Sequence, residues 1–128
     1  RVALTSYSDF GQPLRPQMER VRDAVKILDG RRVDFEYDGD MQADTALNFD
    51  HMKRLYPFCR LTGPANCLIM PALHSANISA KMMRVLGGGT VIGPMLVGLA
   101  KPVQIVQMGA TVNDIVNAAA LAAHDAIR

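Results

Sequence analysis

The 128-residue chain has few of the residues that build metal sites or covalent cross-links. Cys67 falls in a short apolar run, where a thiol usually behaves as a small hydrophobe, and Cys59 precedes it by eight positions. Because disulfides are rare in the cytosol, we expect both cysteines to be reduced structural residues. The histidines, His51, His74 and His124, are far apart and lack metal-ligand spacing, so the sequence predicts no metal site.

The chain also lacks a long apolar run and a strong charge of either sign. No run reaches the roughly 18 residues that a membrane span requires. The 14 basic and 12 acidic residues give a net charge of +2, and the basic residues are scattered apart from Arg31 and Arg32, which excludes a nucleic-acid-binding stripe. The first residue is Arg1 and no signal peptide is present, so we expect a cytoplasmic piece of a longer protein.

The composition, with 49% hydrophobic and 20% charged residues, favours one folded domain. Apolar runs alternate with helical patterns along it. We expect strands at 2–6, 33–37, 67–70 and 103–106, and helices at 16–28, 50–56, 76–86 and after Thr111. This order predicts an α/β fold with a mostly parallel sheet, in which 67–70 is a buried central strand. Ligand sites should then lie in the turns at 71–77 and 107–114.

Three other segments have more than one interpretation. The acidic stretch 38–44 would bind a cation or orient a ligand, but its Asp-Gly pair also signals a turn, and we favour the turn. Ser75–Asn77 and Gly87–Gly89 would each suit a phosphate, yet the first is also an ordinary helix N-cap and the second an ordinary C-cap.

The glycine-rich apolar segment 90–99 has one interpretation: it predicts a buried backbone that another part of the protein or a ligand approaches closely.

Four ordered motifs carry a family resemblance: YDGDMQADTAL (37–47), LIMPALHSANI (68–78), LGGGTVIGPMLVGLAKPV (86–103) and GATVNDIVN (109–117). They resemble the carboxyl-terminal half of bacterial phosphate acetyltransferases. The resemblance is closer to the acetyltransferase-like domain that follows the catalytic part of large bacterial NADP-dependent malic enzymes, and it covers about residues 2–126. It implies a three-layer α/β/α fold related to isopropylmalate dehydrogenase, with residues 1–128 as the second half of a regulatory domain.

The resemblance also implies a coenzyme A cleft. The implied cleft residues are Asn77, Gly93, Pro94, Gln107, Met108 and Asp114, with Gln42 and Asp44 beside them. In active phosphate acetyltransferases the aspartate at Asp114 acts on the thiol of coenzyme A, although its capping-box spacing from Thr111 is enough to explain it structurally. Those enzymes carry Ser-Arg-Gly just before it, whereas this chain has Gln107, Met108 and Gly109. Methionine cannot bind an acyl phosphate through charge-assisted hydrogen bonds.

We therefore expect the fold and the cleft to persist while acetyl transfer has been lost. The resemblance implies that the domain binds acetyl-CoA as an inhibitor and supports a homo-oligomer of a malic enzyme, whose NADP and Mg or Mn sites lie upstream. Two alternatives stay open. One is a phosphate acetyltransferase that uses other groups in place of the serine and arginine. The other is an oligomerisation module whose cleft is closed by Met108 and Ile92.

Overall fold

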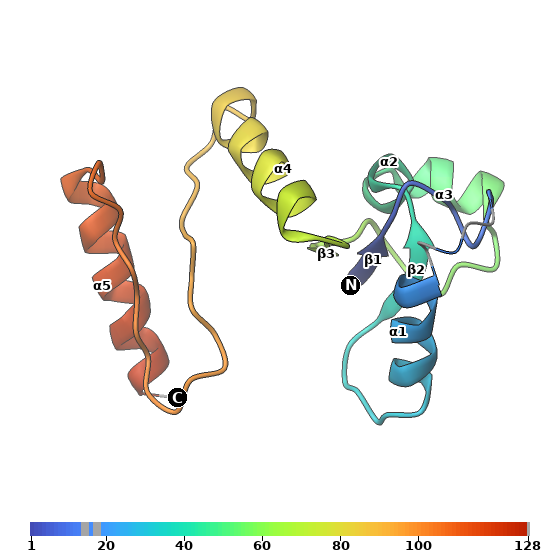
Figure 1. Cartoon of the computed structure of the whole chain (residues 1–128), viewed down its shortest axis with the longest axis horizontal. Coiled ribbons are helices and arrows are strands. Elements are labelled where there is room, and N and C mark those ends of the chain that lie inside the picture. The colour runs from blue at the N-terminus through green and yellow to red at the C-terminus, as the bar shows by residue number, and fades with distance from the viewer. Residues whose placement is uncertain (14–15, 17–18, 128) are drawn as a thin grey trace. The chain divides into compact units, whose positions relative to one another are not determined.

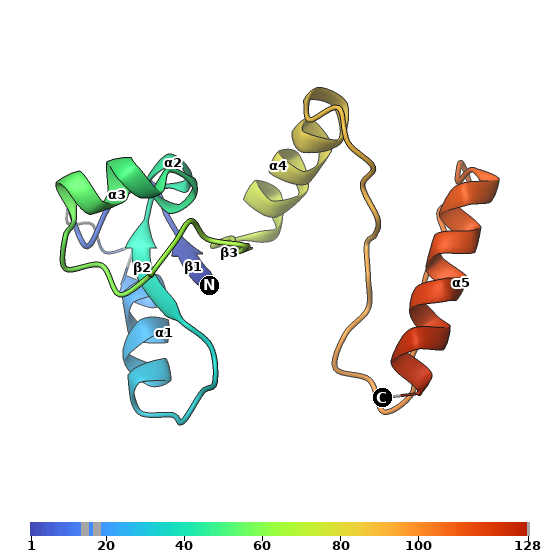
Figure 2. The same ribbon diagram turned by 180° about the vertical axis from the view of Figure 1, so that it is seen from behind.

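The computed structural model describes residues 1–13, 16 and 19–127 (Figure 1). The chain divides into two compact units, Arg1–Lys81 and Met82–Arg128, and helix α4 (Leu73–Leu86) runs across the boundary between them. Figure 2 shows the same elements from behind. No helix in the described part is both long and apolar enough to cross a bilayer.

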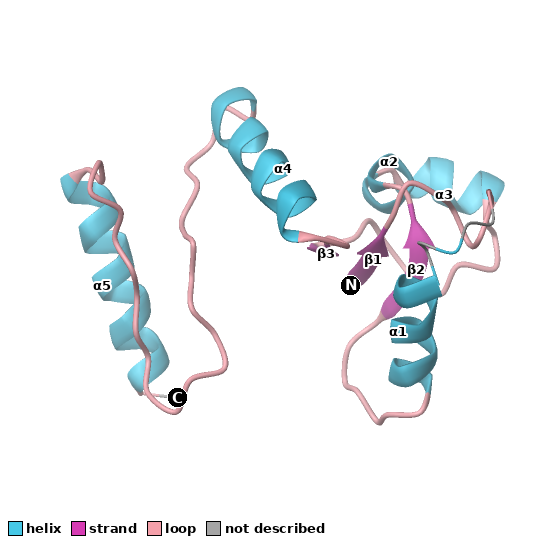
Figure 3. Cartoon of the chain, in the orientation of Figure 1, coloured by secondary structure: helices cyan, strands magenta, loops and turns pink. Residues whose placement is uncertain are grey.

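The first unit is built on a three-stranded parallel sheet (Figure 3). Its strands are β1 (Val2–Thr5), β2 (Tyr37–Met41) and β3 (Cys67–Ile69), in the order β2-β1-β3. In register, Val2 lies opposite Tyr37 on one side and Cys67 on the other. The parallel sheet was predicted correctly, but β1 is the central strand of the described sheet. The prediction of a buried central strand at 67–70 is wrong, since Cys67 and Ile69 are exposed.

Strand β2 begins where the predicted strand at 33–37 ends, so that prediction was placed too early. The turn predicted at 38–44 is also wrong, because Asp38, Gly39 and Met41 pair with residues of β1. Gly39 is needed for close approach of the two strands. Its φ is +154°, and a Cβ there would lie 2.6 Å from the carbonyl oxygen of Leu4. The Asp-Gly pair thus marks a strand contact, and glycine is present because no side chain fits.

Helix α1 (Glu19–Asp29) packs one apolar face on the sheet, as its hydrophobic spacing predicted. Val21 and Val25 are buried against Leu4, and Leu28 and Tyr37 border this cluster. The helix was expected to begin at residue 16, and residues 17–18 of that expected first turn lie outside the described residues. Burial of such side chains stabilises the unit by about 1.5–3 kcal/mol each.

The second core cluster of this unit lies under α2 (Ala43–Leu47) and α3 (Phe49–Leu55). Met41, Met52 and Leu61 are fully buried in it. Helix α3 was predicted within a residue of its bounds, and its N-cap Asn48 accepts a hydrogen bond from the backbone N–H of His51. The irregular segment 58–66 then leads into β3.

Helix α4 begins at Leu73, three residues before its predicted start, so Ser75–Asn77 lie inside the helix. The N-cap prediction for them is wrong, and Ser75 Oγ donates to the carbonyl oxygen of Ala72 at 2.7 Å. The predicted glycine stop is confirmed, because Gly87 N–H donates to Met83 O and Gly88 has a φ of +62°.

The second unit ends in α5 (Val112–Ala126), which Thr111 opens as predicted. Two other predictions fail here. Segment 90–99 is exposed, and 103–106 contributes a single antiparallel bridge, between Met95 and Gln104, in place of a strand. A strand needs a hydrogen-bonding neighbour along its length, and the described residues of this unit supply one only at that bridge.

Both cysteines of the described chain are free thiols. Cys59 is buried in the core below α3, and this burial raises the pKa of its thiol. Cys67 is exposed at the start of β3, so the prediction that it is buried is wrong.

Candidate functional site

Four of the predicted cleft residues line one cavity of the second unit. Gly93, Pro94, Gln107 and Asp114 border a space of about 150 Å³ between the 91–95 segment, the 104–110 segment and α5. The bridge between Met95 and Gln104 holds the two segments beside each other. Gly93 has a φ of +133°, a conformation that side chains disfavour, which explains glycine at this bend.

Asp114 is fixed in this cavity by a reciprocal capping box with Thr111. Its Oδ2 accepts from Thr111 N at 2.8 Å and from Thr111 Oγ1 at 2.9 Å, and Asp114 N donates to Thr111 Oγ1 at 3.2 Å. The hydrogen bonds from the Thr111 backbone and hydroxyl, with a smaller contribution from the positive charge of Arg84, lower the pKa of Asp114. The cavity therefore presents an ionised carboxylate at neutral pH.

This capping box should make the first turn of α5 sensitive to acid. A carboxyl group whose pKa is lowered by folding stabilises the fold above its unfolded pKa of about 3.9, and that contribution disappears as the pH falls through the lower folded value. We expect the amide resonance of Thr111 to shift with a midpoint below about pH 3.9. An NMR titration checks this, and Asp114→Asn should abolish the shift. A midpoint above pH 4.5 in the unsubstituted protein would contradict the arrangement.

The other predicted cleft residues lie elsewhere. Met108 is fully exposed and does not border the cavity, although its neighbours Gln107 and Gly109 do. Asn77 lies within α4 and belongs to the first unit, as do Gln42 and Asp44. The structure therefore groups half of the predicted set.

Gln42 and Asp44 lie at the carboxyl ends of β1 and β2, where a parallel sheet usually places ligands. Gln42 is tied to the buried Asp9: its backbone N–H and Nε2 each donate to that carboxylate at 2.8 Å. Burial, then the charge of Asp9 and that of Asp44, raise the pKa of Tyr56. Sequence reasoning missed Asp9, because its hydrogen-bond partner Gln42 lies 33 positions away in the chain.

A buried polar cluster beside them was also missed. Asp40 is fully buried, its Oδ2 accepts from Ser8 Oγ, and Ser6 Oγ lies 3.2 Å from the same oxygen. Asp40 Oδ1 has no partner among the described residues. The cluster holds the loop after β1 against the end of β2. Asp40 lies in the acidic stretch 38–44, but nothing in that stretch indicates that Ser6 and Ser8 are its partners.

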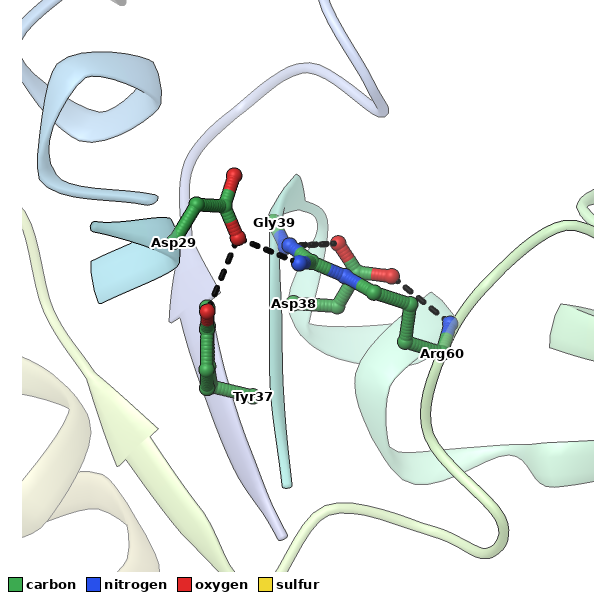
Figure 4. Close-up of polar contacts among 5 residues, drawn as sticks. All are labelled: Asp29, Tyr37, Asp38, Gly39 and Arg60. Atoms are coloured by element: carbon green, nitrogen blue, oxygen red, sulfur yellow. Dashed lines mark hydrogen bonds and ion pairs between the residues drawn. The ribbon is translucent and has the colours of Figure 1, made fainter. Parts of the chain in front are cut away.

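On the first unit, Arg60 contacts three side chains from two elements: Asp29 of α1, and Tyr37 and Asp38 of β2 (Figure 4). Its guanidinium lies 2.5 Å from Asp29 Oδ1 and 3.2 Å from Asp38 Oδ1, with its central carbon 4.7 Å from the ring centre of Tyr37. Hydrogen bonds from Arg60 and from the hydroxyl of Tyr37 lower the pKa of Asp29. This clamp fixes α1 and the 58–66 segment to β2, so its role is structural.

The chain is similar to known proteins over almost its whole length. The family model described as phosphate acetyl/butaryl transferase matches residues 1–123. The chain belongs to this family. The phosphotransacetylase structure from Streptococcus pyogenes superposes with a TM-score of 0.90 at 36% identity, covering 98% of this chain and 38% of that one. The EutD phosphotransacetylase of Staphylococcus aureus gives 0.88 at 30% identity and covers 98% of this chain and 39% of that one. The predicted α/β fold class is confirmed.

Within the phosphate acetyl/butaryl transferase family, malic enzymes are among the similar relatives. The chain is 64% identical over 126 residues to the NADP-dependent malic enzyme of Rhizobium meliloti, which covers 98% of this chain and 16% of the relative. The phosphate acetyltransferase of Paracoccus denitrificans is 41% identical over 123 residues, covering 96% of this chain and 39% of the relative. The chain thus spans less than a fifth of that malic enzyme's length.

Proposed function

We propose that residues 1–128 are the carboxyl-terminal half of a phosphate acetyltransferase-like regulatory domain in an NADP-dependent malic enzyme. Its cavity binds acetyl-CoA as an allosteric inhibitor, and the domain supports a cytoplasmic homo-oligomer. The preceding part of that enzyme converts malate to pyruvate and carries the NADP and the Mg²⁺ or Mn²⁺. The 64% identity to a malic enzyme supports this assignment over a stand-alone acetyltransferase.

The observation that carries the regulatory role is a family cavity without its motif arginine. Gly93, Pro94, Gln107 and Asp114 border the cavity, but position 108 is an uncharged, exposed methionine. Transfer of an acetyl group from acetyl phosphate builds negative charge that preorganised donors must stabilise, and a thioether supplies none. Acetyl-CoA that is bound without being turned over inhibits the enzyme by binding one of its conformational states more tightly than another.

The test is calorimetric titration of the full-length enzyme with acetyl-CoA, together with assays of malate decarboxylation and acetyl phosphate formation. We expect saturable binding, no acetyl phosphate above background, and a loss of malate affinity of about 5- to 150-fold at saturating acetyl-CoA, the usual range of allosteric coupling. Asp114→Ala should weaken acetyl-CoA binding, because it removes the capping box that fixes the start of α5 at the cavity wall. Asp50→Asn, which changes an exposed carboxylate in the first turn of α3, is the matched control.

Two other outcomes would replace this proposal. Acetyl phosphate formation that falls in Asp114→Asn would show an active phosphate acetyltransferase. No acetyl-CoA binding at millimolar concentration, equivalent to a binding free energy weaker than about −4 kcal/mol, would leave an oligomerisation module, whose deletion should change subunit assembly.

A further inference from the structure

The cavity carries a positive charge from outside the family motif. Arg84, in the last turn of α4, lines the same space as Gln107 and Asp114. Gln104 and Asn117 border it as well, so carboxamide side chains from two further positions accompany the guanidinium. Among the described residues that line the cavity, Arg84 is the basic one, since the others are apolar, neutral polar or, at Asp114, acidic.

The guanidinium of Arg84 is available to a ligand. Within the described part of the chain it forms no salt bridge, whereas Lys26 and Arg60 do. Its charge nevertheless reaches the site, because it contributes to the lowered pKa of Asp114 after the hydrogen bonds from Thr111. A basic residue in the last helical turn also complements the helix dipole. That effect favours a cation at this turn of α4 but does not account for its place on the cavity wall.

The chemistry of these groups matches a phosphoryl group. A guanidinium binds two phosphate oxygens through a planar pair of N–H donors, and carboxamide groups can add further donors. The volume of about 150 Å³ is smaller than the roughly 300–1,000 Å³ of pockets that enclose drug-sized ligands. The cavity thus has room for one end of a coenzyme or for a free phosphate, with the rest of a larger ligand outside.

Asp114 makes a positive neighbour necessary for such a ligand. Its ionised carboxylate would repel a phosphate dianion at short range, and a nearby guanidinium offsets that repulsion. We propose that Arg84 is the anion-binding residue of this cavity and that it binds a phosphoryl group there. This inference rests on the proposed function for the larger ligand, acetyl-CoA, but free phosphate tests it separately.

The experiment measures the binding of inorganic phosphate, acetyl-CoA and acetylpantetheine, which carries no phosphate, to the full-length protein by calorimetry. Arg84→Gln should weaken phosphate binding about 10- to 100-fold, the value of hydrogen bonds to a charged group, and leave acetylpantetheine unchanged. Arg84→Lys keeps the positive charge but lacks the planar pair of N–H donors, so its phosphate affinity should lie between those of the wild type and Arg84→Gln. Arg20→Gln removes an exposed arginine of α1 and should change nothing. Circular dichroism of each variant checks that the fold is intact.

The same binding data show whether the phosphoryl group belongs to coenzyme A or to a small phosphate compound. A parallel loss of acetyl-CoA affinity in Arg84→Gln would assign the group to coenzyme A, and a loss limited to phosphate would assign it to free phosphate or an acyl phosphate. Phosphate and acetyl-CoA affinities that are equal in the wild type and Arg84→Gln would overturn the inference and leave the proposed function standing. Arg84-dependent phosphate binding without any acetyl-CoA binding would overturn the proposed function alone. A wild-type protein that binds neither ligand would overturn both.

Discussion

Replacing Gly39 by alanine is expected to lower the free energy of unfolding of the first unit by about 3 kcal/mol. The new Cβ would lie 2.6 Å from Leu4 O and 2.9 Å from Leu4 Cβ, inside the paired β1 and β2 strands. The backbone at φ +154° adds a further cost for any residue with a side chain. Because neither neighbour is the flexible end of a side chain, relief requires that the strands separate.

Hydrogen exchange measured by mass spectrometry on the full-length protein would show this as faster exchange in peptides that contain β1 and β2. The control is Gly88→Ala, which also has a positive φ, +62°, but where a Cβ would meet nothing within 4 Å. It should cost about 1 kcal/mol, the strain of the left-handed conformation alone. Equal effects of the two substitutions would show that close packing at Gly39 contributes little.

Removing the carboxylate of Asp38 should destabilise the first unit more than removing the guanidinium that binds it. Asp38 is buried and accepts hydrogen bonds from the backbone N–H groups of Arg60 and Gly39, at 2.8 and 2.9 Å (Figure 4). Asp38→Ala leaves both donors without an acceptor, a loss of about 3 kcal/mol. Arg60→Ala leaves those two bonds in place and removes a half-exposed guanidinium, a loss of about 1 kcal/mol.

Urea denaturation of the two variants and of the double variant, followed by far-ultraviolet circular dichroism, measures the difference. Asp38→Asn keeps one acceptor oxygen without the charge and should lie between the two alanine variants. Equal losses for Asp38→Ala and Arg60→Ala would show that the ion pair dominates, and that the backbone hydrogen bonds to Asp38 contribute little.

Elements determined by local chemistry were predictable from the sequence. The start of α5 follows from Thr111 and Asp114, which are three residues apart and satisfy each other's backbone groups. The end of α4 follows from a glycine that adopts a left-handed conformation without strain. Strands β1 and β3 follow from short apolar runs. In each case the deciding interaction lies within a few residues of the element.

Strand β2 was misplaced because its stability depends on distant partners. Asp38 and Asp40 look like turn residues, yet Arg60 and Ser8, 22 and 32 positions away, donate hydrogen bonds to their carboxylates and offset part of the cost of burying them. The apolar segment 90–99 fails for a related reason. Its composition predicts burial, but burial requires a covering element, and the described second unit supplies none.

The cavity lining could be predicted only in part. Gly93, Pro94, Gln107 and Asp114, which line it, were predicted from the motifs that carry the family resemblance. Arg84 was not, because the residue lies in a helix seven positions before the nearest lining residue, Val91, and only the fold brings its helix turn to the cavity. Asp9 was missed likewise, since nothing around it in the sequence points to Gln42.

The strand order β2-β1-β3 has a consequence for the growing polypeptide on the ribosome. Of the three described strands, the central one precedes both of its neighbours in the sequence, and the second neighbour ends at Ile69, 67 residues after Val2. At the usual 5–20 residues per second, β1 waits roughly 3–13 s with at least one open edge. During that interval its unpaired backbone groups on the side of β3 are accessible to chaperones. A pause in translation before Cys67 would prolong this exposure, whereas a pause after β3 has left the ribosome would not.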